Sequence, residues 1–501
     1  MKGLTKRFGT VVANDGIDLQ INRGEILSLL GENGSGKTTL MNMLSGIYQP
    51  DEGQILVDGE PVSIRSPKDA YAYRIGMIHQ HYKLVDVFTA AQNIVLGLND
   101  EKLDLKQINS KVQEICKRYG FNIEPSKKVY DMSVSQKQTL EIIKVLYRGA
   151  DILILDEPTA VLTPQETEKL FVILKNMKAD GKAVVIITHK LHEVMAISDK
   201  VAVLRKGKYI GTVETSKTNP QMLTEMMVGH AVALNIERPK YRKPFDKLRV
   251  EGLTCVDHEG ICKLQDVSFT ARGGEILGVA GIAGSGQKEL LESIAGLYPV
   301  KEGSITCIEC EDHQVQLVGL APRQIRNAGV GMAFVPEDRL GMGLVGSMGM
   351  TGNMMLRSWK QGRSMFLDKR GPEKLAREIW EKLEVVTPST EFPVRRMSGG
   401  NVQKVLVGRE ISREPSVLLT AYAVRGLDIN TSYAIYNLLT YQKMRGSAVI
   451  YIGEDLDVLL ELCDRILVLC AGKVSGIVDA RKTTKEEVGL MMTSLKEAKN
   501  D

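Results

Sequence analysis

The hydrophobic pattern of this chain alternates between short apolar runs and longer amphipathic stretches. Strands buried on both faces of a parallel sheet form nearly continuous apolar runs rich in β-branched residues. Runs of this kind occur at 26–30, 151–156, 183–188 and 276–280. Beyond the first and the last of them, apolar residues recur at helical spacing, as at Leu40, Met43 and Leu44. The pattern predicts an α/β fold built from strand, turn and helix units.

The same unit occurs twice along the chain. The stretch GEILSLLGENGSGKTTLMNMLSGIYQPDEGQI from Gly24 aligns without a gap with GEILGVAGIAGSGQKELLESIAGLYPVKEGSI from Gly274. This repeat predicts two domains, residues 1–234 and 248–501. Residues 235–247 contain two prolines and a basic cluster, so we interpret them as a linker whose charges face solvent. The second copy opens with LRVEGLT and the first with only MKGLT, so either the first copy lacks most of its opening strand or the chain start lies further upstream.

Composition narrows the class of protein. Of the 501 residues, 43% are apolar and 25% are charged, which suits folded domains with full cores. The net charge of +4 is small for this length and argues neither for nucleic acid nor for an acidic surface. Seven cysteines spread over a long chain indicate reduced thiols. No stretch reaches the roughly 18 apolar residues of a spanning helix, so a role at a membrane requires a partner.

The first copy contains a complete phosphate-binding loop between its first apolar run and the helix that follows. Glycines let backbone N–H groups surround phosphates, a Lys reaches the β- and γ-phosphates, and a Thr hydroxyl can bind Mg²⁺. A Gly-rich turn without this function would not need the Lys-Thr pair. We assign nucleotide contacts to Gly31, Asn33, Gly34, Ser35, Gly36, Lys37, Thr38 and Thr39.

Two carboxylates follow the apolar strand ILILD of the first copy. We expect Asp156 to bind the metal and Glu157 to orient or deprotonate the attacking water. Gln80 and His189 would complete the surroundings of the γ-phosphate, with Gln80 as a further metal ligand beside Thr38. Taken alone, a Gln in a loop or a His after a strand is more often structural, and their order along the chain favours the functional interpretation.

The order of these motifs resembles that of the ATP-binding cassette (ABC) ATPases, over essentially the whole chain and twice. The resemblance implies, in each half, a mostly parallel sheet core with an antiparallel β subdomain and a helical subdomain. It also implies ATP and Mg²⁺ as cofactors. In such ATPases two cassettes meet head to tail, and each ATP lies between the phosphate loop of one cassette and the signature helix of the other.

The signature segments of the two copies differ. The second copy has MSGGNVQK, which is close to the family pattern and assigns ATP contacts to Ser398, Gly399, Gly400 and Asn401. The first copy has MSVSQKQ, in which Val134 and Ser135 stand at the glycine positions. Side chains at these positions should obstruct the close approach that glycine allows.

The remaining losses all affect the second copy. Its loop, GIAGSGQKE, has Gln287 at the position of the Lys and Lys288 at that of the hydroxyl. Further along the second copy, four more active residues of the first are replaced, by Glu337 for Gln80, Ala421 for Asp156, Tyr422 for Glu157 and Glu454 for His189. The resemblance therefore predicts one hydrolytic composite site around Lys37 and one degenerate site around Gln287. Whether the degenerate site binds nucleotide stays open, although its backbone amides remain.

The resemblance assigns roles to three further features, and two of them have an alternative explanation. Phe8 stands where the family has an aromatic residue that stacks on adenine, and a core Phe is the alternative. Asp428 is expected to reach across to the intact site. The Met-rich run 341–357 is either an adaptable surface for permease helices or core filler.

Two fused cassettes with a weakened second loop resemble the energising subunit of bacterial importers for simple sugars and nucleosides. The stretches GMIHQHYKLVDVFTAAQNIVLG and FVPEDRLGMGLV are more similar to the nucleoside branch. The resemblance implies ATP hydrolysis coupled to solute import at the cytoplasmic face of the cell membrane. The implied partners are integral-membrane permease subunits and, indirectly, an extracytoplasmic solute-binding lipoprotein, with no nucleic acid.

Two other classes of protein stand against this interpretation. Twin-cassette ATPases that act on ribosomes usually keep both sites intact and have a long charged linker, and those that act on DNA contain zinc modules. Here the linker is short, the sites are unequal, and Cys307 and Cys310 are better explained as strand or turn cysteines than as half of a zinc site. A binding module without turnover would not need both Glu157 and His189.

Overall fold

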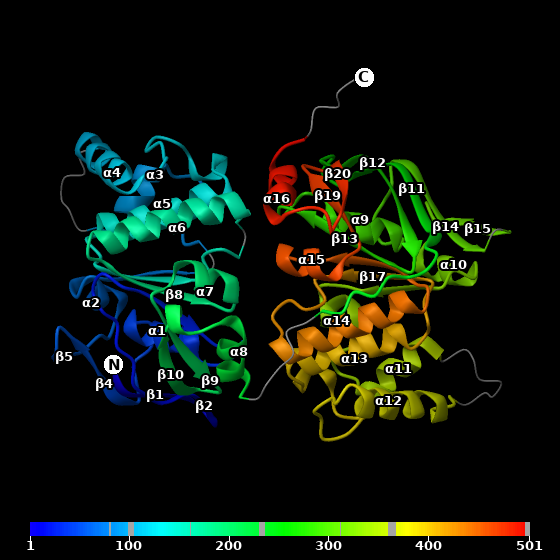
Figure 1. Ribbon diagram of the computed structural model, residues 1–501, viewed down its shortest axis with the longest axis horizontal. Helices are drawn as coiled ribbons and strands as arrows, with labels where there is room; N and C mark the ends of the chain where they lie inside the picture. Colours follow the sequence, from blue (N-terminus) through cyan, green and yellow to red (C-terminus); the bar gives the residue numbers. More distant parts are fainter. Residues whose placement is uncertain are drawn as a thin grey trace. The chain divides into compact units, whose positions relative to one another are not determined.

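The chain folds into two compact units, Met1–Ala233 and Leu234–Asp501, which are described separately (Figure 1). The structure is a computed structural model, and it describes residues 1–79, 82–98, 105–160, 162–229, 236–310, 312–358 and 367–495.

The first unit contains a parallel sheet and an antiparallel sheet. The larger sheet has the order β10-β9-β3-β8-β7-β6, in which only β10 runs antiparallel to its neighbour, and the smaller sheet has the order β2-β1-β4-β5. The strands are β1 (Lys2–Phe8), β2 (Val11–Ile17), β3 (Ile26–Leu30), β4 (Glu52–Val57), β5 (Glu60–Val62), β6 (Ile75–Ile78), β7 (Ile152–Asp156), β8 (Ala183–Thr188), β9 (Lys200–Arg205) and β10 (Lys208–Glu214). The helices are α1 (Lys37–Leu44), α2 (Pro67–Ala72), α3 (Ala90–Val95), α4 (Leu105–Tyr119), η1 (Val129–Asp131), α5 (Val134–Tyr147), α6 (Pro164–Ala179), α7 (Leu191–Ile197), η2 (Thr215–Lys217) and α8 (Pro220–Val228).

The apolar runs predicted as strands are confirmed, because both faces of the large sheet are covered. Successive side chains of a strand point to opposite faces. Leu27 of β3 therefore packs with Leu4 of the antiparallel sheet and Leu40 of α1. Ile26 faces the other side, where it belongs to a cluster with buried residues of α3, α4, α5 and α6. In Figure 1, α3, α4 and α5 gather at the end of the first unit opposite β1 and β4.

The second unit repeats this plan. Its large sheet has the order β16-β17-β18-β13-β19-β20, with β20 antiparallel, and its small antiparallel sheet has the order β12-β11-β14-β15. The strands are β11 (Phe245–Val256), β12 (Cys262–Gly273), β13 (Glu275–Gly281), β14 (Glu302–Cys310), β15 (His313–Gln316), β16 (Met332–Val335), β17 (Val417–Ala421), β18 (Ala448–Ile452), β19 (Arg465–Cys470) and β20 (Lys473–Asp479). The helices are α9 (Gln287–Ile294), α10 (Pro322–Asn327), η3 (Arg339–Gly343), α11 (Met350–Ser358), α12 (Arg370–Lys382), η4 (Val394–Arg396), α13 (Gly399–Ile411), α14 (Ile429–Met444), α15 (Leu456–Leu462) and α16 (Lys485–Thr493).

The segment predicted as a solvent-facing linker is in part built into the second unit. Ile236 is buried in the core of that unit, and the guanidinium of Arg238 donates hydrogen bonds to the carbonyls of Leu460, at 2.8 Å, and Cys463. Strand β11 begins at Phe245, so the last three residues assigned to the linker lie in a strand. The expectation that the basic cluster faces solvent is wrong for Arg238, because helix-terminal carbonyls bind its charge.

The opening strands of the two units differ in length. Strand β1 has 7 residues and β11 has 12. Strand β1 pairs with both β2 and β4, so the first unit contains an opening strand at the same place in its antiparallel sheet.

A Lys-Asp pair below the large sheet recurs in both units with different burial. In the second unit Lys443 is 1% exposed and lies 2.8 Å from Asp464, which also accepts a hydrogen bond from the backbone of Ile276 in β13. The corresponding Lys178 of the first unit is 37% exposed and lies 2.5 Å from Asp199. Breaking the ion pair would therefore leave a less exposed carboxylate in the second unit, Asp464, than in the first, Asp199.

Lys443→Met should destabilise the second unit by about 2 kcal/mol, because it removes a buried cation and leaves the half-buried carboxylate of Asp464 without it. Lys178→Met should cost the first unit less than about 1 kcal/mol, because water can replace an exposed partner. Urea unfolding followed by tryptophan fluorescence measures the second unit alone, since both tryptophans, at 359 and 380, belong to it. Hydrogen exchange of peptides from β3 measures the first unit. Equal losses in the two units would contradict this prediction.

Candidate functional site

The phosphate loop of the first unit connects β3 to α1, and two glycines fix its shape. A Cβ added to Gly31 would lie 2.4 Å from the carbonyl oxygen of Leu204 and 2.4 Å from Ser35 Oγ. Gly36, the N-cap of α1, has a φ of 97°, and a Cβ there would lie 2.4 Å from the carbonyl oxygen of Ala13. Only glycine satisfies both positions, so the sequence dictates a narrow turn that presents backbone N–H groups at the start of α1.

The ammonium group of Lys37 spans this turn. It donates hydrogen bonds to the carbonyls of Gly31, at 2.7 Å, and Glu32, at 2.9 Å, and the residue is only 6% exposed. Burial lowers the pKa of Lys37, and the charges of Glu157 and Asp156 act in the opposite direction. A positive charge is thus held inside the loop, at the place where the sequence predicts contact with phosphate.

The first predicted carboxylate lies at the end of β7, beside the start of α1. Thr38 Oγ1 donates a 3.2 Å hydrogen bond to Asp156 Oδ2. Asp156 is 8% exposed, and burial raises its pKa while the hydrogen bond from Thr38 lowers it. A hydroxyl and a buried carboxylate at this separation fit a hard divalent cation such as Mg²⁺, which prefers oxygen ligands.

The second carboxylate is paired with the predicted histidine. Glu157 has a φ of 47°, a conformation that few non-glycine residues adopt, and its N–H donates to the carbonyl of Ile187 in the neighbouring strand β8. His189 Nδ1 lies 2.9 Å from Glu157 Oε1. This hydrogen bond is the main reason why the pKa of Glu157 lies below its usual value, and burial opposes it. The carboxylate is therefore ionised and oriented, as a base for water must be.

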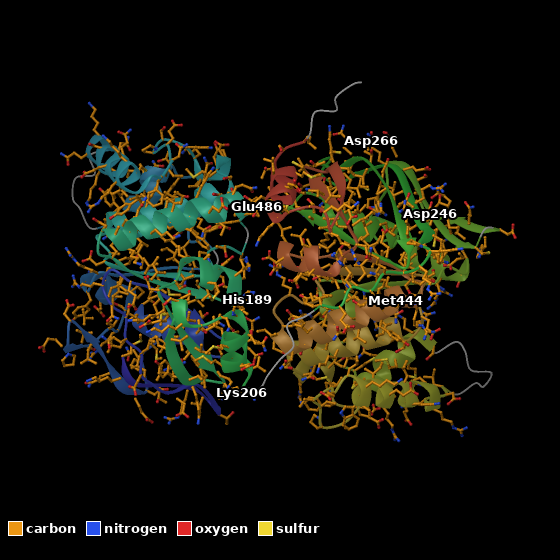
Figure 2. All side chains as sticks on the ribbon, viewed as in Figure 1. His189, Lys206, Asp246, Asp266, Met444 and Glu486 are labelled. Atoms are coloured by element: carbon orange, nitrogen blue, oxygen red, sulfur yellow. The ribbon has the colours of Figure 1, made fainter. Side chains whose placement is uncertain are left out.

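His189 follows β8 at the end of the large sheet and is labelled in Figure 2. Its side chain is 48% exposed, whereas that of Glu157 is 19% exposed. The imidazole thus remains accessible to a ligand while one of its nitrogens positions the carboxylate.

Other predicted residues of the first unit lie less deeply. Gln80 falls outside the described residues, so its prediction stays untested. Asn33 is exposed and Thr39 is half-buried. Phe8 is 44% exposed and contacts Tyr48 edge to face at 5.2 Å. The alternative of a core Phe therefore does not apply, and its ring is accessible for stacking.

The loop of the second unit has the same backbone shape with other side chains. Gly286 caps α9 with a φ of 97°, the same value as Gly36. Gln287 takes the place of Lys37 in the interior of the loop, where it is 3% exposed and donates a 3.1 Å hydrogen bond to the carbonyl of Ile282. A neutral amide thus closes this loop in place of a cation.

The carboxyl ends of the second unit's strands form a different cluster. Tyr422 has a φ of 50°, like Glu157, but burial raises the pKa of its phenol to about 12, which leaves it neutral. Arg425 forms an ion pair with Glu337 and a second one, at 3.0 Å, with Glu454. The residues that replace Gln80 and His189 are therefore joined by a single guanidinium. Sequence reasoning missed Arg425, because nothing in its own neighbourhood indicates two acidic partners 88 and 29 positions away.

The signature segment of the second unit begins helix α13. Ser398 is its N-cap, and its hydroxyl accepts hydrogen bonds from Asn401 N, at 3.4 Å, and Asn401 Nδ2, at 2.9 Å. Asn401 Oδ1 in turn accepts from the backbone N–H of Val386. Ser398 and Gly399 are exposed, so the amino end of this helix is open to a ligand.

Asp428 has a local role that the sequence prediction did not include. It caps α14, accepting hydrogen bonds from the N–H and the hydroxyl of Thr431, both at 2.8 Å. A Cβ added to Gly400 would lie 3.2 Å from Asp428 Oδ2. The cap thus lies directly against the signature helix, and the predicted reach of Asp428 to an ATP site stays a prediction.

In the signature segment of the first unit, side chains cover the amino end of helix α5. Ser133 forms a capping box with Gln136, with hydrogen bonds in both directions at 3.2 Å. Val134 occupies the first helical position and is 38% exposed. An isopropyl group here stands where Gly399 leaves the helix end open.

A Gly-rich loop closed by a lysine, with an oriented carboxylate nearby, occurs in one unit, and a loop of the same backbone shape without these groups occurs in the other. The model of the family described as ABC transporter matches residues 14–160 and 264–420, which include both loops. The chain belongs to the ABC transporter family. It is an ATPase of that family, with two ATP-binding cassettes in tandem.

Several characterised relatives match this ABC protein over nearly its whole length. It is 43% identical to the nucleoside import ATP-binding protein NupA of Lactococcus lactis, over 98% of this chain and 97% of that protein. It is also 43% identical to the guanosine import ATP-binding protein NupO of Bacillus subtilis, over 98% and 96%. A ribose import ATP-binding protein of Streptomyces avermitilis is 37% identical over 100% and 94%. The predicted resemblance to importer ATPases with fused cassettes is confirmed.

Among solved structures, the archaeal ribosome recycling factor aABCE1 in complex with the stalk protein aP1 matches with a TM-score of 0.63. The sequence identity is 16%, and the match covers 98% of this chain and 92% of that one. This similarity concerns the fold alone. Within the described ranges, no helix of this ABC protein has the length and apolar character needed to cross a membrane.

Proposed function

We propose that this chain energises nucleoside import by hydrolysing ATP at the Lys37 loop, which the signature segment at Ser398 completes. The observation that supports this most directly is the hydrogen-bonded pair of Glu157 and His189, at 2.9 Å, next to a buried lysine. The second loop has no equivalent pair, since Tyr422 and Glu454 occupy those positions. Hydrolysis in the first unit alone follows from this difference.

The residues of the first unit have separable roles in the proposed reaction. Lys37 offers its charge to the β- and γ-phosphates, and the N–H groups at the start of α1 bind phosphate oxygens. Glu157 accepts the proton of the attacking water, while His189 keeps the carboxylate ionised and oriented. Mg²⁺, held by Thr38 and Asp156 and, as the sequence predicts, by Gln80, would neutralise charge on the phosphates.

The partner that we propose is an integral-membrane permease at the cytoplasmic face of the membrane, with a solute-binding lipoprotein acting on its other side. Within the second unit, the Met-rich run contains both buried and exposed side chains: Leu344, Met350 and Met354 are buried in the core. Large apolar side chains of the run that are at least one-third exposed are Met342, Val345, Met348 and Leu356, and Leu340 lies next to them in sequence. Such a grouping suits contact with apolar helix ends.

Nucleosides are proposed as the solute because two relatives at 43% identity are named for nucleoside and guanosine import. Simple sugars are the second candidate, supported by relatives named for ribose and glucose import at 37% and 39% identity. Right-side-out membrane vesicles that contain the assembled transporter and are loaded with ATP should accumulate labelled guanosine and should not accumulate labelled ribose. Uptake of ribose alone would reverse this choice and leave the ATPase proposal intact.

Glu157→Gln should lower steady-state ATP hydrolysis by at least about 100-fold, because it removes the only proposed base for water. ATP binding should persist, since the loop and Lys37 are unchanged. The measurement is phosphate release by the permease-bound complex, with Glu454→Gln in the second unit as the control that should keep its turnover. Near-normal hydrolysis by the Glu157 variant would show that the base has been assigned wrongly.

The proposed pairing of loop and signature is tested by exchanging Gly399 and Val134. A Cβ at Gly399 has only the flexible end of Arg339 within 4 Å, at 3.2 Å, so Gly399→Val should fold. It should slow hydrolysis about 100-fold or more by keeping the helix end from the γ-phosphate. Val134→Gly should leave turnover nearly unchanged. The two variants are compared in the same phosphate-release assay, and the opposite order of effects would invert the pairing.

A further inference from the structure

The second phosphate loop keeps the backbone of the first almost unchanged. Ser285 N donates to the carbonyl of Ile282 at 3.0 Å, as Ser35 N does to that of Glu32 at 3.1 Å. The carbonyl of Ser285 accepts a 3.2 Å hydrogen bond from the N–H of Gly472, in the turn between β19 and β20. The carbonyl of Ser35 accepts the equivalent 3.1 Å bond from Gly207, between β9 and β10. The arrangement of N–H groups that could surround phosphates is thus preserved, and the family model matches this region as well.

The donor set for a divalent cation is not preserved. Lys288 follows Gln287 at the position of the Thr38 hydroxyl, and Ala421 ends β17 where Asp156 ends β7. Glu337, the carboxylate at the position of Gln80, is paired with Arg425. Mg²⁺ requires several oxygen ligands in a near-octahedral arrangement. The residues of the second unit do not fit this ion.

A cavity of about 410 Å³ opens beside this loop, and Lys288, Glu337 and Ala421 are among the residues that line it. Lys288 is 57% exposed, and its ammonium lies 3.7 Å from Glu292 Oε1, longer than a hydrogen bond. The cation can therefore turn into the cavity. In the first unit, Asp156 and Glu157 place two negative charges next to the phosphates, which a divalent cation must offset. In the second unit, Ala421 and the neutral phenol of Tyr422 remove both charges.

We propose that the second phosphate loop binds a nucleoside di- or triphosphate without a divalent cation, with the ammonium of Lys288 in its place. This inference deepens the proposed function, because it makes the second loop a binding site that does not turn over.

Two of the acidic groups that line the cavity, Glu337 and Asp338, are engaged by other residues, and the third, Glu292, faces Lys288. Glu337 and Glu454 share the guanidinium of Arg425, at the side of the cavity where the γ-phosphate environment lies in the first unit. Asp338 Oδ1 accepts a 2.8 Å hydrogen bond from Gly341 N. Glu292 is partly buried, and burial raises the pKa of its carboxyl. Lys288 is the cation among the residues that line the cavity, and its long contact with Glu292 leaves its charge available to phosphate.

The test uses the fluorescent nucleotide mant-ATP and the permease-bound complex with Lys37→Ala, which weakens the first loop. Binding to the second loop should change by less than about threefold when Mg²⁺ is removed with EDTA. Adding Lys288→Ala should weaken it about tenfold, the value of one charge-assisted contact. Lys301→Ala, which removes another exposed lysine of the same unit, should have no effect.

A variant that should gain a requirement for Mg²⁺ provides a second test, because a loss of binding in Lys288→Ala could also come from misfolding. Lys288→Thr with Ala421→Asp restores two metal ligands, and it should make binding require Mg²⁺. Three results would each overturn the inference: no binding in the Lys37→Ala complex, a loss of more than about tenfold in EDTA, or no effect of Lys288→Ala. None of them affects hydrolysis by the wild-type complex and its loss in Glu157→Gln, so a failure here is distinct from a failure of the proposed function.

Discussion

The chemistry of the first unit depends on one buried ammonium group. Lys37 is almost fully enclosed by the loop, and such burial favours the neutral amine. Asp156 and Glu157 counter this effect, so the cation and each of the two carboxylates stabilise one another's charges, while the two carboxylates repel each other. The second unit supports this link between the lysine and the carboxylates. Where the lysine becomes Gln287, the two carboxylates become Ala421 and Tyr422, and no isolated charge is left inside.

Shape and charge are therefore separate properties of this fold. Tyr422 has nearly the same φ as Glu157. The N–H of each residue donates to a carbonyl of the neighbouring strand, that of Ile187 for Glu157 and that of Ile452 for Tyr422. Gln287 fills the loop as Lys37 does. Backbone geometry is fixed by the glycines and by the sheet, which contribute to stability in either unit. The reacting groups are added to that frame, and they can be replaced without loss of the frame.

Sequence alone predicted the frame, and it named residues of the first unit that the structure brings together, because both depend on local pattern. Continuous apolar runs, the repeat from Gly24 to Gly274 and the loop around Lys37 are visible within short windows. Contacts between distant segments were not visible. The cluster of Arg425 with Glu337 and Glu454 requires three strand ends to meet, and the burial of Arg238 requires a helix end from more than two hundred residues later. The capping role of Asp428 was local but was obscured by its expected distant role.

The distribution of losses has a consequence for how a fused chain differs from a pair of identical cassettes. In a pair of identical chains, a substitution in the loop or in the signature alters both composite sites at once. With both units in one chain, a weak signature in the first unit and a weak loop in the second lie, under the proposed pairing, in the same site. The intact loop and the intact signature then remain together in the other. Fusion thus allows Val134, Ser135 and Gln287 to diverge while the site of Lys37 keeps every group that its buried charge requires.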